Sequence, residues 1–182
     1  MGAILVKTER EVLTNLEWLT QQMRAKTINF QQTTGVAKGG INFEERCGAI
    51  ASIQSPPHQA LLSILVWGDY RDSTQDYKCL QEYIAELLYE HLEKTTQRKH
   101  FDLKKFAMKV ARMEIFFYFR HELKKQYTLD GRLKFAGIKE VTAPSYSNKY
   151  SKLGAIVEGA IQWMFEDMEF YIDEYRKNLK KD

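Results

Sequence analysis

The sequence has few of the residues that interrupt helices or bind metals. Only three prolines occur among 182 residues, and two of them are adjacent. The two cysteines, Cys47 and Cys79, form no C-x-x-C pair and have no histidine at zinc-ligand spacing. No Glu-x-x-His pair accompanies the four histidines, which argues against a di-metal carboxylate bundle. We therefore expect no metal and no cofactor, and we expect reduced thiols of the kind typical of the cytoplasm.

Long apolar runs and recognisable catalytic motifs are also missing. The run after Met1 is too short to span a membrane, and it lacks the basic lead and cleavage site of a signal peptide. The stretch GVAKGG, from Gly35 to Gly40, lacks the Gly-Lys-Ser/Thr ending of a phosphate-binding loop. No nucleophile and base stand together in the sequence. We expect a cytoplasmic protein without membrane contact that binds a partner and is not an enzyme.

Apolar residues recur at helical spacing through most of the chain, which predicts an all-α fold in a single domain over residues 1–182. The predicted helices are one over 9–26, a short one around Cys47 and Ile50, one that begins at Pro56, one capped by Ser73, one over 102–127, a short one from Thr128 to Gly137, and a long last one to about Leu179. Residues 27–42 are expected to form a loop. The last helix is about 45 Å long. This is longer than a small domain needs, so we expect its end to project or to pair with a second copy of the chain.

Positive charge is concentrated in the middle of the chain. Residues 94–152 hold 15 Lys and Arg against 5 Asp and Glu, a balance of +10, whereas residues 1–93 sum to −4 and residues 153–182 to −3. Segregated charge of this kind attracts polyanions, so double-stranded DNA is the expected partner of a region over 94–165. The basic residues proposed to contact it are Arg98, Lys99, Lys105, Lys109 and Arg112. The alternative is an ordinary solvated face, on which lysine stems cover apolar surface.

A helix-turn-helix is predicted between Leu129 and Met164. The short helix LDGRLKFAG is followed by IKEVTAPSYS and a second helix, although this connection exceeds the usual turn of three or four residues. The first turns of the second helix carry groups that bond phosphates or base edges, namely Tyr146, Ser147, Asn148, Lys149, Tyr150, Ser151 and Lys152. Arg132, Lys134 and Lys139 are expected to contact the DNA backbone. The alternative is a helical hairpin with a polar first turn.

The stretch LGAIVEGAIQW, from Leu153 to Trp163, resembles the helix that closes the DNA-binding region of the lambdoid phage Q-type antitermination proteins. The matching residues are Gly154, Ile156, Val157, Glu158 and Gly159. The resemblance implies a small helical phage regulator that binds DNA near a late promoter and acts on RNA polymerase. The chain differs from that family in its longer connection between the helices, and it lacks the cysteine cluster of the zinc-bearing members.

Two functions follow as expectations. The first is a DNA-binding, phage-type transcription regulator whose acidic helix face, formed by Glu82, Glu86, Glu90 and Glu93, contacts a host protein such as RNA polymerase. The alternative is a phage-encoded interaction module that inhibits a host nucleic-acid machine, for which an exposed acidic face is the expected feature. The aromatic run Phe116 to Phe119 suits stacking on bases, but packing in the core is the favoured interpretation.

Overall fold

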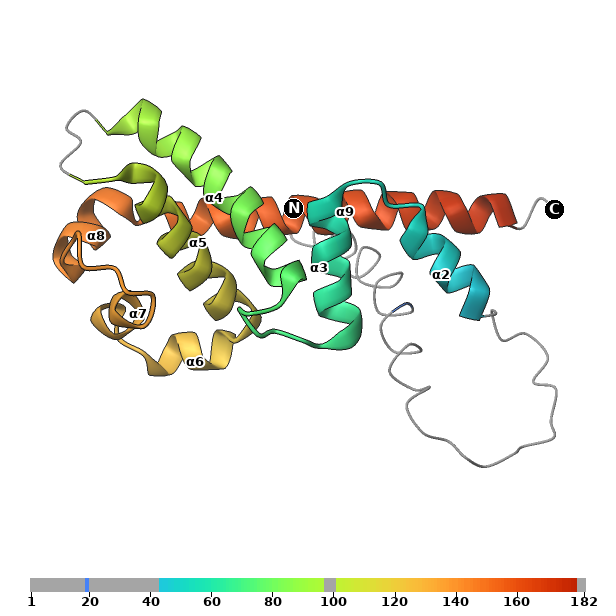
Figure 1. Ribbon diagram of the computed structural model, residues 1–182, viewed down its shortest axis with the longest axis horizontal. Helices are drawn as coiled ribbons and strands as arrows, with labels where there is room; N and C mark the ends of the chain where they lie inside the picture. Colours follow the sequence, from blue (N-terminus) through green and yellow to red (C-terminus); the bar gives the residue numbers. More distant parts are fainter. Residues whose placement is uncertain (1–18, 20–42, 97–100, 180–182) are drawn as a thin grey trace, which may run out of the picture. The chain divides into compact units, whose positions relative to one another are not determined.

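The computed structural model describes Leu19 and residues 43–96 and 101–179, among which helices are joined by short connections and no strand occurs (Figure 1). The helices are α2 (Phe43–Ala51), α3 (Pro56–Trp67), α4 (Gln75–Thr95), α5 (Leu103–Phe119), α6 (His121–Gln126), α7 (Leu129–Phe135), α8 (Ala143–Tyr150) and α9 (Lys152–Leu179). The predicted all-α class and the long last helix are therefore confirmed. The helix expected over 9–26 and the loop expected over 27–42 lie outside the described residues, apart from Leu19, which is helical and buried.

Contacts divide the chain into two compact units. Unit 1 comprises residues 1–69 and 164–182, so it contains α2, α3 and the second part of α9. Unit 2 comprises residues 70–163 and contains α4 to α8 with the first part of α9. The single domain expected from the sequence stays a prediction.

Side-chain caps fix where the helices of unit 2 begin. The hydroxyls of Thr74, Thr128 and Thr142 and the carboxylate of Asp102 each accept a hydrogen bond from a backbone N–H in the first turn of the following helix. Thr74 caps α4, so the predicted cap at Ser73 is wrong by one residue. Gly137 ends the turn after α7 with a φ of 68°, as its predicted capping role requires.

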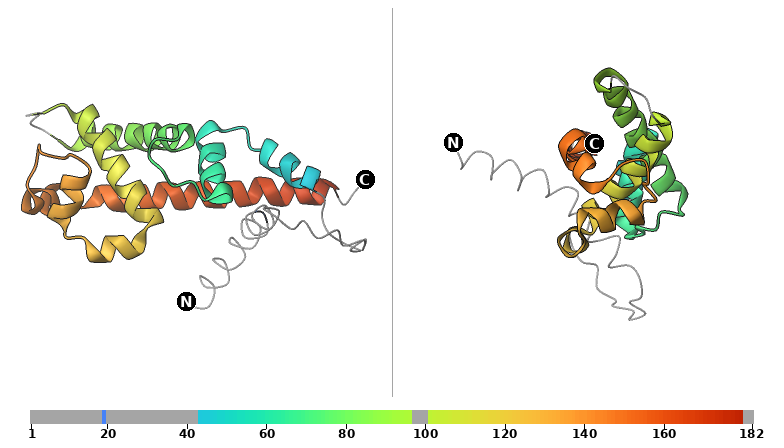
Figure 2. Two further views of the ribbon diagram at one scale, coloured as in Figure 1. Left: turned by 60° about the horizontal axis from the view of Figure 1, so that its bottom comes forward. Right: turned by 90° about the vertical axis from the view of Figure 1, so that its left-hand side faces the viewer.

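The core of unit 2 forms where α4 packs along α5, which also contacts α6 and α7 (Figure 2). The predicted apolar stripe of α4 supplies Leu80, Ile84, Leu88 and Leu92, all fully buried, while the four glutamates of its acidic face are exposed. The aromatic run of α5 packs internally, as favoured from the sequence. Phe117 is buried, and the ring of Phe116 lies 4.4 Å from that of Phe135 on α7.

Two predicted helices are each divided in the structure. The helix expected over 102–127 breaks at Arg120, whose backbone leaves the helical region while its guanidinium stacks on Phe116 and bonds the carbonyl of Tyr70. The second helix of the predicted helix-turn-helix is divided at Ser151 into α8 and α9, and residues 136–142 connect α7 to α8. Neither glycine nor proline stands at Arg120 or Ser151, so the sequence pattern does not mark these breaks.

Unit 1 is held by packing of α2 and α3 against α9. Gly48 on α2 lies directly beneath the hydroxyl of Tyr175, where a Cβ would not fit without a shift of the ring. The buried face of α3 includes Leu61, Leu62 and Ile64, and Met164 and Met168 of α9 are fully buried. Pro56 occupies the first turn of α3, as predicted.

Candidate nucleic-acid interface

Several basic residues of the charged middle are engaged in ion pairs. Arg112 donates to Asp72 across 40 positions of sequence, and Lys109 donates to Glu140. Lys124 lies between two carboxylates, 2.9 Å from Glu158 Oε1 and 3.6 Å from Glu114 Oε2. Such pairs tie elements of unit 2 together. They engage Lys109 and Arg112, both of which the sequence predicts to contact DNA.

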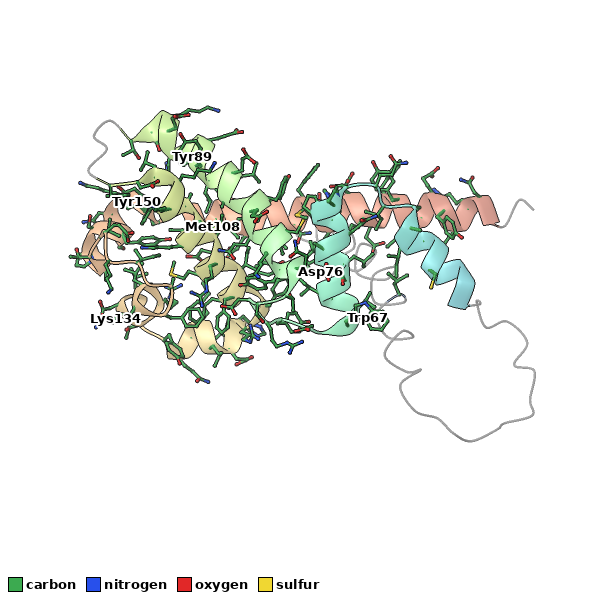
Figure 3. The ribbon with its side chains drawn as sticks, viewed as in Figure 1. Trp67, Asp76, Tyr89, Met108, Lys134 and Tyr150 are labelled. Carbon is green, nitrogen blue, oxygen red and sulfur yellow. The ribbon has the colours of Figure 1, made fainter. Side chains whose placement is uncertain are left out.

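The other basic residues predicted to contact the DNA backbone differ in their surroundings. Lys105 is exposed, beside the carboxylate of the α5 cap Asp102. Lys134 is exposed on α7 and pairs with Asp130 at 2.6 Å, one helical turn earlier (Figure 3). The hydrogen bond to Asp130 raises the pKa of Lys134, which stays charged. Exposed pairs of this kind are worth little and can exchange for a phosphate. Arg98 and Lys99 lie outside the described residues.

Two of the residues predicted to read bases are buried. Tyr146 and Tyr150 are 4% and 8% exposed, and both belong to the aromatic packing between α8 and α5. The Tyr146 hydroxyl lies 3.4 Å from Glu114, and burial together with this carboxylate raises the pKa of the phenol. Their burial argues against the DNA contact predicted for these two tyrosines, because helical spacing turns them to the core while their neighbours face solvent.

The other five predicted residues of this stretch are exposed together. Ser147, Asn148 and Lys149 on α8, with Ser151 and Lys152 at the start of α9, form what we call the α8 surface. No acidic residue occurs between Val141 and Val157. Across the part of the chain that the structure describes, neither Lys149 nor Lys152 makes an ion pair. Lys139, also exposed, lies in the connection that precedes α8.

No protein-family model, no curated protein and no solved structure matches the chain. Among residues 43–96 and 101–179 there is no cluster of three or more His, Cys, Asp or Glu able to hold a metal. Within those same ranges no helix is long and apolar enough to cross a membrane. Function must therefore be argued from the α8 surface and its surroundings.

A polar pocket beside the α8 surface escaped the sequence analysis. It has a volume of about 300 Å³ and is lined by Glu114, Lys124, Arg132, Tyr146, Glu158 and neighbouring residues of α8 and α9. Glu114 is only 5% exposed, although it is a carboxylate on the largely apolar α5. The sequence carries one signal of this pocket. Glu114 is an acidic residue among the apolar Met113, Ile115 and Phe116, and a buried charge needs partners.

A second arrangement missed from the sequence lies in unit 1. The Ser55 hydroxyl is 2.7 Å from Nδ1 of the buried His58, and Nε2 of His58 is 3.2 Å from Asp167 Oδ2. A serine that contacts a histidine, which in turn contacts an aspartate, is the arrangement that activates a serine nucleophile. However, Pro56 and Pro57 remove the backbone N–H groups that would stabilise an oxyanion next to Ser55. The arrangement instead fastens the first turn of α3 to α9.

The cysteines have the surroundings expected of reduced thiols. Cys47 and Cys79 are both free, and Cys47 is exposed. Burial, with smaller contributions from Glu82 and Asp76, raises the pKa of the Cys79 thiol, which lowers the fraction of reactive thiolate at neutral pH.

Proposed function

We propose that the chain is a DNA-binding transcription regulator that contacts the duplex through the α8 surface. The single observation that carries this proposal is the exposed, acid-free set Ser147, Asn148, Lys149, Ser151 and Lys152. Lysines of this kind bond phosphates, and Ser and Asn bond phosphates or base edges. The resemblance of residues 153–163 to the Q-type antitermination proteins supports the same proposal and adds RNA polymerase as a partner.

The proposed DNA contact involves fewer residues than the whole basic middle of the chain. Lys109 and Arg112 hold unit 2 together, whereas Lys139, Lys149 and Lys152 are exposed and available. Each neutralised phosphate contributes about −0.9 to the slope of log affinity against log salt concentration. Three contacts therefore give a slope of about −3. Contributions from other exposed lysines, such as Lys104 and Lys125, would make it steeper.

Fluorescence anisotropy of labelled duplex DNA across a salt series tests the proposal. Random duplex and promoter fragments of the encoding genome are compared, and a regulator binds one promoter fragment more tightly. The variant Lys149→Ala/Lys152→Ala is expected to weaken binding and to make the salt slope shallower by about 2. The matched control Lys78→Ala/Lys177→Ala removes the same charge from exposed positions on α4 and α9 and leaves the slope unchanged.

Either of two results would reject the proposal. One is an absence of binding at low salt, and the other is an unchanged slope in the Lys149→Ala/Lys152→Ala variant. In both cases the α8 surface has no role in DNA contact.

The acidic face of α4 supports a second candidate, an interaction module that occupies the nucleic-acid channel of a host protein. Glu82, Glu86, Glu90 and Glu93 are all exposed, and a row of carboxylates at helical spacing can imitate a phosphate backbone. Glu82 and Glu86 also line a pocket of about 330 Å³ with Tyr89 and Met108, which lie on α4 and α5 (Figure 3). This candidate predicts that a host protein is bound without DNA and that Glu82→Gln/Glu86→Gln abolishes the interaction.

A further inference from the structure

Two buried tyrosines fix which side of α8 faces the solvent. Tyr146 and Tyr150 are 4% and 8% exposed, and the ring of Tyr150 lies 5.1 Å from that of Phe106 on α5. Tyr146 places its hydroxyl beside Glu114, which also belongs to α5. Because both rings are anchored in this way, turning α8 about its axis would expose apolar surface at a cost in free energy.

Asn148 lies at the point of α8 that is farthest from this buried side. Successive residues of an α-helix are separated by about 100° around the axis, and Asn148 is two positions from each of the two tyrosines. It is therefore about 200° from Tyr146 in one sense and from Tyr150 in the other, opposite the midpoint of the pair. The Asn148 side chain is exposed, and its carboxamide makes no hydrogen bond with any other residue that the structure describes.

The other residues of the α8 surface form two flanks around Asn148. Lys149 and Lys152 lie on one side of it, about 100° and 40° away around the axis. Ser147 and Ser151 lie on the other side, about 100° and 60° away. Ser151 keeps helical backbone angles, with φ of −57° and ψ of −30°, so this spacing continues to the first residue of α9. Asn148 is thus the outermost residue, between a cationic flank and a hydroxyl flank.

The carboxamide of Asn148 can identify a base in a way that its neighbours cannot. It holds one donor and one acceptor in a plane, which complements the N7 acceptor and the N6 donor of adenine in the major groove. A lysine ammonium only donates, so it bonds phosphates and guanine alike, and a serine hydroxyl either donates or accepts. Among the five residues of the α8 surface, Asn148 is therefore the one that matches a single base.

We propose that Asn148 is the specificity-determining residue of the α8 surface and reads an adenine in the DNA major groove. Its amide N–H donates to N7, and its carbonyl oxygen accepts from the N6 amino group. Lys149 and Lys152 contact the phosphates beside this base. The inference rests on the proposed function, because it assigns the base contact within the same surface.

Selection of bound duplexes from a random library, with the full chain, first identifies the preferred sequence. Fluorescence anisotropy then compares that duplex with copies in which each A·T pair is changed in turn to G·C. At one position the change is expected to weaken binding at least about fivefold, the lower value for a bidentate base contact. Replacing that adenine by 7-deazaadenine, which keeps its base pairing but lacks N7, is expected to weaken binding as well.

Asn148→Ala is expected to bind the preferred duplex at least about fivefold more weakly and to lose the discrimination between adenine and 7-deazaadenine. Its salt slope should not change, since no charge is removed. The matched control is Asn178→Ala, which removes an exposed carboxamide from the last turn of α9, outside the α8 surface. It should bind as the unaltered chain does. Both asparagines are exposed, so we expect both variants to fold.

The proposed function and this inference fail in different ways. An absence of DNA binding at low salt rejects both. A salt slope that becomes shallower in Lys149→Ala/Lys152→Ala, with adenine discrimination that survives in Asn148→Ala, overturns this inference alone. Binding without sequence preference, or with a preference that no adenine affects, would also overturn it, because the α8 surface would then make no adenine contact.

Discussion

Arg112 donates hydrogen bonds from both Nε and Nη2 to Oδ2 of Asp72, at 2.9 and 2.6 Å. The pair links α5 to the segment that precedes α4, and Tyr77 of α4 adds a bond from its hydroxyl to the Arg112 carbonyl. A residue expected to face DNA thus serves the internal structure of unit 2.

Arg112→Ala is expected to lower the free energy of unfolding by about 1 kcal/mol, because the pair is partly exposed to solvent. Urea denaturation of Arg112→Ala, Asp72→Ala and the double variant measures the coupling, expected at about 0.5–1 kcal/mol. DNA affinity and its salt slope should not change in Asp72→Ala. Additive effects of the two substitutions would show that the pair contributes no coupling to stability.

Glu114 and Glu158 share Lys124 but should differ in their effect on stability. Glu114→Ala removes a buried acceptor and leaves the Tyr146 hydroxyl without its partner, at a cost of about 3 kcal/mol. Glu158→Ala removes an exposed partner, and we expect a loss of no more than about 0.5 kcal/mol. Urea midpoints compared at constant m-value measure both losses. Similar losses in the two variants would contradict the distinction between a buried and an exposed carboxylate.

His58 makes the stability of the protein depend on pH. Burial lowers the pKa of His58, an effect that the Asp167 carboxylate only partly opposes. The unfolded chain therefore takes up a proton near pH 6.5 while the folded chain resists it, so stability is lost as pH falls below about 6.5. The loss levels off once the pH is below the folded pKa.

The measurement is the free energy of urea unfolding at about pH 8 and at about pH 5. His58→Gln should reduce the difference between the two values. His121→Gln, at an exposed histidine, should reproduce the pH dependence of the unaltered chain. A pH dependence that His58→Gln leaves intact would assign it to another group.

Two glycines should respond to alanine with opposite signs. Gly137 has a φ of 68°, a backbone conformation that side chains disfavour, so Gly137→Ala is expected to cost about 1–2 kcal/mol. Gly159 is an exposed residue inside α9, and a Cβ there meets nothing within 4 Å. Gly159→Ala should therefore stabilise the protein by about 0.5–1 kcal/mol, because alanine favours the helix. Thermal denaturation distinguishes the two, and a lower Tm in Gly159→Ala would contradict the stated surroundings.

The elements that the sequence predicted correctly are those with local causes. The apolar stripe of α4 and the stop of α7 at Gly137 both follow from spacing and from glycine geometry. The break at Arg120 did not follow, since neither glycine nor proline marks it, and the Arg120 side chain bonds the carbonyl of the distant Tyr70. The cap at Thr74 was missed because Ser73 and Thr74 are both good caps.

The candidate site was predicted only in part for a related reason. Counting charge along the sequence treated Lys109 and Arg112 as available cations, but their partners Glu140 and Asp72 are distant in the sequence. Tyr146 and Tyr150 are buried because their positions around the helix place them toward the core, whereas their neighbours in the sequence are exposed. The pocket of Glu114 depends on residues drawn from five helices, so no local pattern could indicate it.

Oxidation of the buried methionines can show when the helices around them separate. Met113, which belongs to unit 2, and Met164 and Met168, which belong to unit 1, are fully buried. Peroxide can add oxygen to such a sulfur only after the surrounding helices separate. The rates at which these thioethers become sulfoxides, read by peptide mass spectrometry, would thus show whether the two units open together or one before the other.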